Sequence, residues 1–396
     1  MSRILRSPFW LWGGLLCSAL SCEPEREVAS LLDSLRVMAV QKDRPYARPG
    51  DSVSLQILWN DGRRNNEAPA RDVQIAWVSG CHNPASELYA LCFAQLAMLA
   101  QTATGADAGT APPSGAPLGF PTPLGFPKLQ CSSTSGGGCP SLGFFAPAPA
   151  GPSSFDFQIP AEIIAVRPPP NDPTLPPWGL SYVFFAICAG ELELDTSGES
   201  FPLRCRDASS GKLLGSDDFV AGYSAVYSYD EPIVLNTNPR VDGVEFGDIS
   251  YLPAEWGQGT LCLGASCVPD AEQNAPALPE DPCSDPGVVC IDRCESDDCE
   301  QIPVLALVDS SQAQTDSVLA AQLGQQLSEQ MWVNYYADGG EFESGTRLLS
   351  DAQRGWNEDH GDQFTAPAEP GWVNIWAISH DSRGGTDWAR IRVYVR

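Results

Sequence analysis

Short runs typical of β-strands recur along the chain, and in most of them apolar and polar residues alternate. They occupy residues 35–40, 53–59, 73–77, 155–159, 182–188, 220–227, 304–308, 331–335, 373–377 and 391–395. Because successive side chains of a strand point to opposite faces, a two-residue period predicts strands with one face in a core. Turn signals such as Asn60-Asp61-Gly62 separate neighbouring runs. The pattern therefore predicts antiparallel β-sandwiches.

The last two runs predict a terminal hairpin that joins across the turn at residues 381–385. Ile391 and Val393 alternate there with Arg390 and Arg392. We expect the two apolar side chains to point into a core and the two arginines to face solvent.

The runs divide the chain into two sandwich domains, residues 35–235 and 302–396. Residues 82–153 interrupt the first domain, and from residue 102 onward they are rich in Gly, Pro, Ala, Ser and Thr. Such a composition buries too little apolar surface to offset the entropy of ordering, so we interpret the interruption as a long low-complexity insertion. Residues 236–301 are acidic and rich in cysteine, which predicts a connector between the domains.

The N-terminus has the order of a secretory signal. Arg3 and Arg6 precede an apolar stretch at residues 9–20, which is well below the ~20 residues of a membrane-spanning helix. Small residues then lead to Cys22. We therefore expect residues 1–21 to be a signal peptide and the protein to be exported.

The residues around Cys22 add a lipid anchor to this prediction. Ala19-Leu20-Ser21-Cys22 resembles a bacterial lipobox, and the resemblance implies cleavage before Cys22, a diacylglyceryl thioether on its sulfur and attachment to the outer membrane, at its periplasmic face or at the cell surface. An ordinary signal peptide that leaves Cys22 unmodified is the alternative. The polar residues 22–34 are predicted to be a tether.

Net charge and the few histidines narrow the function classes. Acidic residues outnumber basic ones by 50 to 23, for a net charge of −27. Such a surface repels phosphate backbones, so we expect no nucleic-acid partner. The chain has three histidines, His82, His360 and His380, which argues against His-based metal sites and His-dependent catalysis. His360 and His380 are expected to be solvated loop residues.

Of the 14 cysteines, Cys17 leaves with the signal and Cys22 takes the lipid. An even number of cysteines in an exported chain predicts a disulfide framework. A thiolate metal site is the alternative, but neither a C-x-x-C spacing nor a nearby histidine supports it. Pairing of neighbours is the simplest expectation, for example Cys131 with Cys139 and Cys262 with Cys267. The twelve candidates are Cys81, Cys92, Cys131, Cys139, Cys188, Cys205, Cys262, Cys267, Cys283, Cys290, Cys294 and Cys299.

The connector also carries Asp285, Asp292, Asp297 and Asp298, whose oxygens suit Ca²⁺. The D-x-D-x-D-G pattern of a calcium loop is missing, so a solvated acidic surface is the favoured interpretation. We expect no other metal and no cofactor. The chain has no G-x-S-x-G, H-E-x-x-H, Walker A or G-x-G-x-x-G motif, and it is predicted not to be an enzyme.

Tryptophans near the terminal hairpin are candidate binding residues. Trp372, Trp376 and Trp388 fall on or beside the hairpin, and Trp372 and Trp376 share one strand face by parity. Exposed aromatic rings stack on sugars or anchor protein partners. In the alternative, this face is the core, and Val373 and Ile375 point outward.

Two segments carry a family resemblance. SLRVMAVQ (34–41) with ARPGDSVSLQILW (47–59), and APAEPGWVNIWAISHDSRGGTDWARIRVYV (366–395), resemble Ig-like lipoproteins of myxobacteria, and P-G-D-x-V-x-L resembles the first strands of Ig-like and PKD-like modules. The resemblance implies two Ig-like sandwiches and work in binding or structure at the cell envelope, and it supplies no catalytic residues.

Together these features predict a mainly β protein with two Ig-like sandwiches joined by a Cys-rich acidic connector. The expected function is that of a lipid-anchored, non-enzymatic cell-envelope protein that binds a protein or polysaccharide partner. A secreted hydrolase that acts on glycans through an unrecognised carboxylate site is one alternative. A calcium-stiffened structural spacer is the other.

Overall fold

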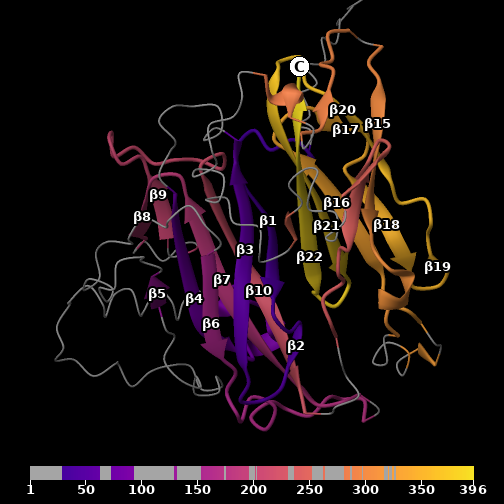
Figure 1. Cartoon of the computed structure of the whole chain (residues 1–396). Helices are drawn as coiled ribbons and strands as arrows, with labels where there is room; N and C mark the ends of the chain where they lie inside the picture. The colour runs from indigo at the N-terminus through magenta and orange to yellow at the C-terminus, as the bar shows by residue number, and fades with distance from the viewer. Residues whose placement is uncertain are drawn as a thin grey trace, which may run out of the picture.

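The structure is a computed structural model in which two β-sandwiches lie side by side (Figure 1). Its described part is mainly β, so the predicted fold class is confirmed. All ten strands expected from the sequence are present. The described residues are 29–62, 73–92, 129–131, 153–173, 175–195, 201, 203–230, 236–251, 262–263, 281–285, 288–296, 298–315, 320, 323–324 and 327–396.

The first sandwich packs a three-stranded sheet on a five-stranded sheet. The first has the order β1 (Leu35–Lys42), β3 (Ser52–Asp61), β6 (Ser153–Gln158), and the second β2 (Tyr46–Ala47), β10 (Phe219–Tyr229), β7 (Trp178–Cys188), β4 (Gln74–His82), β5 (Leu129–Cys131). Alternate residues of β3, namely Val53, Leu55 and Ile57, point into the core, where they meet Trp77 and Phe185. A ribbon of β8 (Glu191–Leu194) and β9 (Leu203–Arg206) lies at one end.

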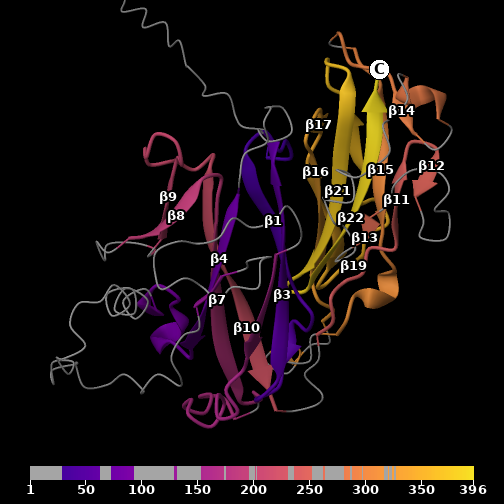
Figure 2. The ribbon, with the colours of Figure 1, turned by 60° about the vertical axis from the view of Figure 1, so that its left-hand side comes forward.

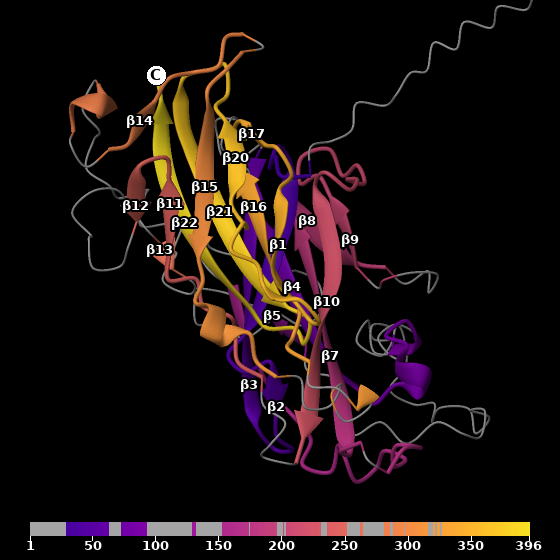
Figure 3. The same ribbon diagram turned by 90° about the vertical axis from the view of Figure 1, so that its right-hand side faces the viewer.

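The second sandwich packs two further sheets. One has the order β12 (Ile249–Tyr251), β11 (Gly243–Phe246), β15 (Gln301–Leu307), β20 (Asp362–Thr365), β17 (Glu341–Phe342), and it faces the viewer in Figure 3. The other has the order β13 (Cys262–Leu263), β22 (Thr386–Val395), β21 (Gly371–Asp381), β16 (Met331–Ala337), β18 (Thr346–Asp351), β19 (Gly355–Trp356), with β14 (Cys290–Ile291) also on β22. Ile391 and Val393 lie in the core between these sheets, as predicted. Short 3₁₀ helices occupy Ala85–Glu87, Pro282–Ser284 and Ser310–Gln312.

The domain boundaries differ from the expected ones at two points. Strands β11 to β14 come from the predicted connector, so the second sandwich begins at Gly243 rather than at residue 302. Strand β5 lies within the predicted insertion and pairs with β4. Strands of two to four residues are too short to show a two-residue period, which is why the sequence did not reveal them.

The predicted tether also belongs in part to the folded body. The N–H of Leu32 donates to the carbonyl oxygen of Ala337 at 2.8 Å, and the N–H of Ala337 donates to that of Ser30 at 2.9 Å. The Leu32 side chain is fully buried. The segment from residue 30 to 34 is therefore fixed to the second sandwich before β1 begins.

Four disulfides are present, which confirms the disulfide framework for eight cysteines. Each joins two cysteines that are neighbours among the cysteines of the chain. Cys139 and Cys267, the partners in the two example pairings, lie outside the described residues. The bonds are Cys81–Cys92, Cys188–Cys205, Cys283–Cys290 and Cys294–Cys299.

The two sandwiches share a packed interface, so four sheets follow one another across the molecule (Figure 2). The outer face of β21 and β22 carries Trp376 and Trp388, which pack against Met38 of β1. Polar contacts continue the interface, since the Gln41 side-chain amide donates to the carbonyl oxygen of Thr386 and to Oδ1 of Asp387, both at 3.0 Å. Both faces of the terminal hairpin are therefore buried.

Candidate functional site

The candidate binding tryptophans are not a platform open to solvent. Trp376 and Trp388 are 4% and 1% exposed because the first sandwich covers their face of the sheet. Trp372 is half-buried, with its ring 5.3 Å from that of Tyr394 and 4.3 Å from the guanidinium of Arg392. The expectation of an exposed aromatic stripe was wrong because the pattern of one strand does not show a second domain packed on it.

The same interface corrects the expected wet face. Arg390 is buried and Arg392 is half-buried, whereas both were expected to face solvent. Their parity places them opposite the core, as predicted, but that side of the sheet faces the first sandwich over much of its length.

The histidines are also less exposed than expected. His360 is buried, with Nδ1 2.8 Å from the carbonyl oxygen of Asn357 and Nε2 3.1 Å from that of Ala306. His380 lies in β21, where its ring stacks on Trp332 at 5.3 Å, and burial lowers its pKa to about 4. Burial likewise lowers the pKa of His82 to about 4. The expectation of solvated loop histidines was therefore wrong for both His360 and His380.

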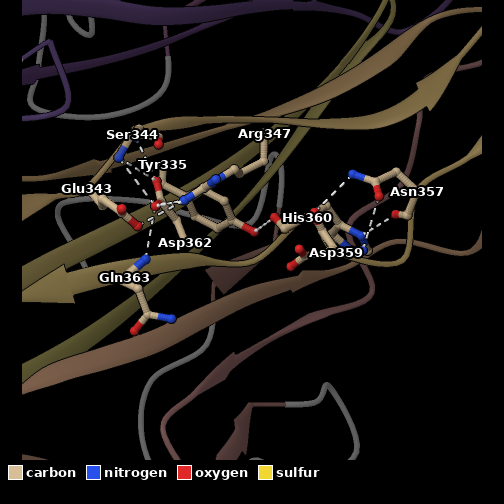
Figure 4. A network of polar contacts seen from close by, with 10 residues as sticks. Tyr335, Glu343, Ser344, Arg347, Asn357, Asp359, His360, Asp362 and Gln363 are labelled. Atoms are coloured by element: carbon tan, nitrogen blue, oxygen red, sulfur yellow. Dashed lines mark hydrogen bonds and ion pairs between the residues drawn. The ribbon is translucent and has the colours of Figure 1, made fainter.

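His360 belongs to a polar network centred on Asp362 (Figure 4). The Asp362 carboxylate accepts from the Arg347 guanidinium at 2.8 Å and from the N–H groups of Ser344, Gly345 and Gln363. The bond to Asp362 raises the pKa of Arg347. Both carboxylate oxygens are thus engaged within the protein. We interpret this network as structural, because both oxygens of Asp362 are used within the protein, where they fix the turn at residues 343–345.

The calcium candidates are not brought together. Asp292 pairs with Arg396 at 2.8 Å, Asp285 ends the short helix Pro282–Ser284, and Asp297 lies outside the described residues. Within the described part of the chain, no group of three or more His, Cys, Asp or Glu side chains is arranged to hold a metal ion.

A cleft of about 690 Å³ lies where the two sandwiches meet. Strands β1 and β10 form two of its walls, and the β21–β22 turn at residues 380–386 forms another. Aromatic residues contribute much of its lining, with four tyrosines from the first sandwich and Trp332 and His380 from the second. The tyrosines are Tyr46, Tyr223, Tyr227 and Tyr229.

Lys42, the last residue of β1, projects into this junction. Its side chain is 4% exposed, and Nζ donates to the carbonyl oxygen of Ala225 at 2.9 Å. Burial lowers the pKa of Lys42 to about 8, although the charge of Asp381 opposes the shift. Gly384 has a φ of +87°, and a Cβ at this position would lie 2.7 Å from Nζ. A glycine therefore lets the hairpin turn close over the amine.

A buried ion pair supports the turn on the side of the second sandwich. Nε and Nη2 of Arg383 donate to the Glu329 carboxylate at 2.8 and 2.6 Å, and Nη2 also donates to the Gln314 side chain at 2.9 Å. Burial raises the pKa of Glu329 against the attraction of Arg383. Asp381 accepts from the N–H groups of Arg383 and Gly385, both at 2.8 Å. The wall of the cleft is thus held in a fixed shape.

This cleft is the candidate functional site, and sequence reasoning did not find it. Its size falls within the range of ligand sites, and it combines aromatic rings with a few polar groups, as binding sites do. Lys42 and Tyr46 of the first sandwich meet Arg383 of the second only because the two domains dock. In the sequence, the turn at residues 381–385 indicated a hairpin rather than a site, and the runs at 35–40 and 220–227 indicated strands.

Comparisons with known proteins give no family. No family model matches the chain, and no curated protein matches it. Among solved structures, it is similar to the native conformation of E. coli alpha-2-macroglobulin at 9% identity and a TM-score of 0.19, with 92% of this chain and 17% of that chain covered. The chain thus spans less than a fifth of that protein, and so low a TM-score carries no argument. Among the described helices, none is long and apolar enough to cross a membrane.

Proposed function

We propose that this protein is an exported, lipid-anchored cell-envelope protein that binds a partner macromolecule without catalysing a reaction. The observation that carries the proposal is the cleft of about 690 Å³ between the two sandwiches. Rings at the site supply contact area at low entropic cost, and the fixed turn of the second sandwich limits the reorganisation that binding requires.

The chemistry of the cleft supports binding rather than hydrolysis. Glycosidases use two carboxyl groups that flank the bond to be broken. Among the described residues that line the cleft, the acidic side chain is Asp381, and it holds the hairpin turn by accepting two backbone N–H bonds. The net charge of −27 supports a partner other than nucleic acid.

The sequence supports attachment to the outer membrane through Cys22, which lies outside the described residues. Acyl chains contribute about 0.8 kcal/mol for each buried CH₂ group, so two or more chains hold a protein on a membrane stably. The described structure begins at residue 29, close to the interface of the two sandwiches. A lipid at Cys22 would therefore hold both sandwiches near the membrane.

A photo-crosslinking experiment in intact cells tests this proposal. A photoreactive amino acid replaces Tyr223, which lines the cleft and is 44% exposed, and in a control it replaces Leu213, which is 53% exposed and is not part of the cleft lining. We expect a discrete crosslinked product at position 223 and not at 213. Cys22→Ala should also release the protein from the membrane fraction. Equal labelling at both positions would count against the cleft as the binding site.

A further inference from the structure

We propose that the cleft binds its partner as an extended peptide strand that adds to the free edge of β10. The inference rests on the proposed function and narrows the partner to a polypeptide segment held by main-chain hydrogen bonds. It also assigns the register, because the structure indicates which residues of β10 present their backbone groups to the cleft.

The first observation is an incomplete strand pairing. On one side, β10 pairs with β7 along its full length, from Phe219 to Tyr229. On the other side, the partner among the described strands is β2, which covers Tyr227 and Ser228. In the facing sheet, β1 is also an edge strand, since it pairs with β3 on one side. Two strand edges therefore border the same cleft.

The second observation is the run of residues that line the cleft. Val37 to Val40 of β1 all contact it, and so do Tyr223, Ser224 and Ala225 of β10. A cavity over the face of a sheet contacts every second residue, because side chains alternate between faces. The run on β1 spans a bulge at Met38, but β10 pairs with β7 in an unbroken register, so contact with its three consecutive residues places the cavity beside the main chain of β10. The wall at β10 is thus a strand edge rather than a strand face.

The third observation identifies the backbone N–H and C=O groups of β10 that can bind a peptide strand. Lys42 Nζ donates to the carbonyl oxygen of Ala225, so this carbonyl points into the cleft and away from β7. In an antiparallel pair, the N–H and C=O of one residue point to the same side, and the side alternates along the strand. Tyr223 and Ala221 therefore direct their N–H and C=O groups to the same edge of β10, and Tyr223 also lines the cleft. The Lys42 amine occupies a position that a strand N–H would take.

The size of the cleft fits a short strand. Neighbouring strands are about 4.8 Å apart and a sheet layer is about 10 Å thick, so about 690 Å³ corresponds to about 14 Å of strand, or about four residues. The pairing of Tyr46 and Ala47 with the same edge of β10 shows that this edge accepts a strand, and the cleft continues that line. One face of the peptide would meet Val40 and Phe185, so we expect its alternate residues to be apolar.

The test separates main-chain recognition from ring stacking at one position. Random nonapeptides displayed on phage are selected on the full chain purified in detergent, and the affinity of a selected synthetic peptide is measured by fluorescence anisotropy. Tyr223→Pro removes the N–H that points into the cleft but leaves the β7 pairing intact, because an edge strand tolerates proline on its free side. Tyr223→Ala removes the ring and keeps the N–H.

We expect Tyr223→Pro to weaken peptide binding at least tenfold and Tyr223→Ala to change it less than threefold. If Tyr223→Pro does not fold, the peptide is N-methylated at each position in turn, and alternate positions should each lose at least tenfold. Equal losses for the two variants, or an N-methyl scan without alternation, would overturn the strand mode. Binding of envelope oligosaccharides in place of any peptide would also overturn it but leave the proposed function intact. Failure of the crosslink at position 223 would remove the proposed function itself.

Discussion

Two buried polar clusters in this molecule use their charges in different ways. In the second sandwich, Asp362 accepts hydrogen bonds from Arg347 and from backbone N–H groups on both carboxylate oxygens. At the cleft, the Lys42 amine has three donors, and its hydrogen bond among the described residues goes to the carbonyl oxygen of Ala225, beside a volume of about 690 Å³. The first cluster is closed, whereas the second is partly open to a ligand.

The difference separates a polar cluster that stabilises the fold from one that belongs to the candidate site. A buried charge whose hydrogen bonds are all made within the protein stabilises one conformation. A buried amine with a lowered pKa lowers the stability of the fold, so its presence points to a role other than stability. Titratable groups with perturbed pKa values gather at functional sites. The Asp362 network therefore holds a turn in place, and Lys42 marks the site.

The largest effect is expected from Asp362→Ala. This change removes the partner of Arg347 and the acceptor of several backbone N–H groups. Each buried donor that is left without its acceptor lowers the free energy of unfolding by about 1–3 kcal/mol, and Asp362 accepts from several. Denaturant unfolding measures the loss, and Asp359→Ala, at an exposed residue that joins the same network through its backbone N–H and C=O, should stay within about 0.5 kcal/mol. Similar losses for the two variants would remove the distinction between a closed network and its solvated rim.

Lys42→Met should act in the opposite direction. Folding lowers the pKa of Lys42 from 10.5 to about 8, so at pH 7 the folded state carries the full cost of a buried cation. This cost is about 3 kcal/mol, and loss of the hydrogen bond to Ala225 offsets about 1 kcal/mol of its removal. The free energy of unfolding of the variant should therefore rise by about 2 kcal/mol.

The same variant has a pH signature with a defined sign. Between pH 8 and 10.5 the unfolded wild-type chain binds more protons at Lys42 than the folded one, so wild-type stability from this group rises with pH. The difference in unfolding free energy between Lys42→Met and wild type should therefore shrink from pH 8 to 10. A difference that stays constant over this range would contradict a lowered pKa at the cleft.

His380→Phe tests the aromatic wall of the cleft. Burial lowers the pKa of His380 to about 4, so the unfolded chain takes up a proton first as the pH falls from 6.5 to 4. The wild type should lose about 2 kcal/mol more than the variant over this range, after allowance for the partial exposure of the ring. Phe keeps the stacking on Trp332. Parallel pH profiles for the two proteins would place His380 in solvent, outside the wall.

The sequence predicted those features that depend on one strand at a time. Alternation located β3, β16 and β22, and it placed Ile391 and Val393 in a core, because a strand's period follows from its own geometry. It failed for Trp376 and Trp388, whose burial depends on the packing of a second sandwich.

The candidate site shows the same limit more strongly. Lys42 and Arg383 are 341 positions apart in the sequence, and no local period connects them. Their proximity depends on the domain interface, which is built from the outer faces of two sheets. Short strands such as β13 and β14 escaped prediction for a related reason, since two residues carry no period while their pairing with β22 is a tertiary property.

The smallest effect is expected from Gln41→Ala, at the part of the interface that adjoins Lys42. The Gln41 amide donates to Thr386 and to Asp387, whose pKa is raised by burial. Asp387 keeps a second bond, from the N–H of Val241 at 3.0 Å, so its carboxylate is not left without a donor. The loss should therefore be about 1 kcal/mol in denaturant unfolding, the worth of a typical hydrogen bond. Gln41→Glu should cost more, because it sets a second carboxylate beside Asp387. If both variants match the wild type, the two sandwiches do not meet along this edge, and a cleft with one wall from each would have no support.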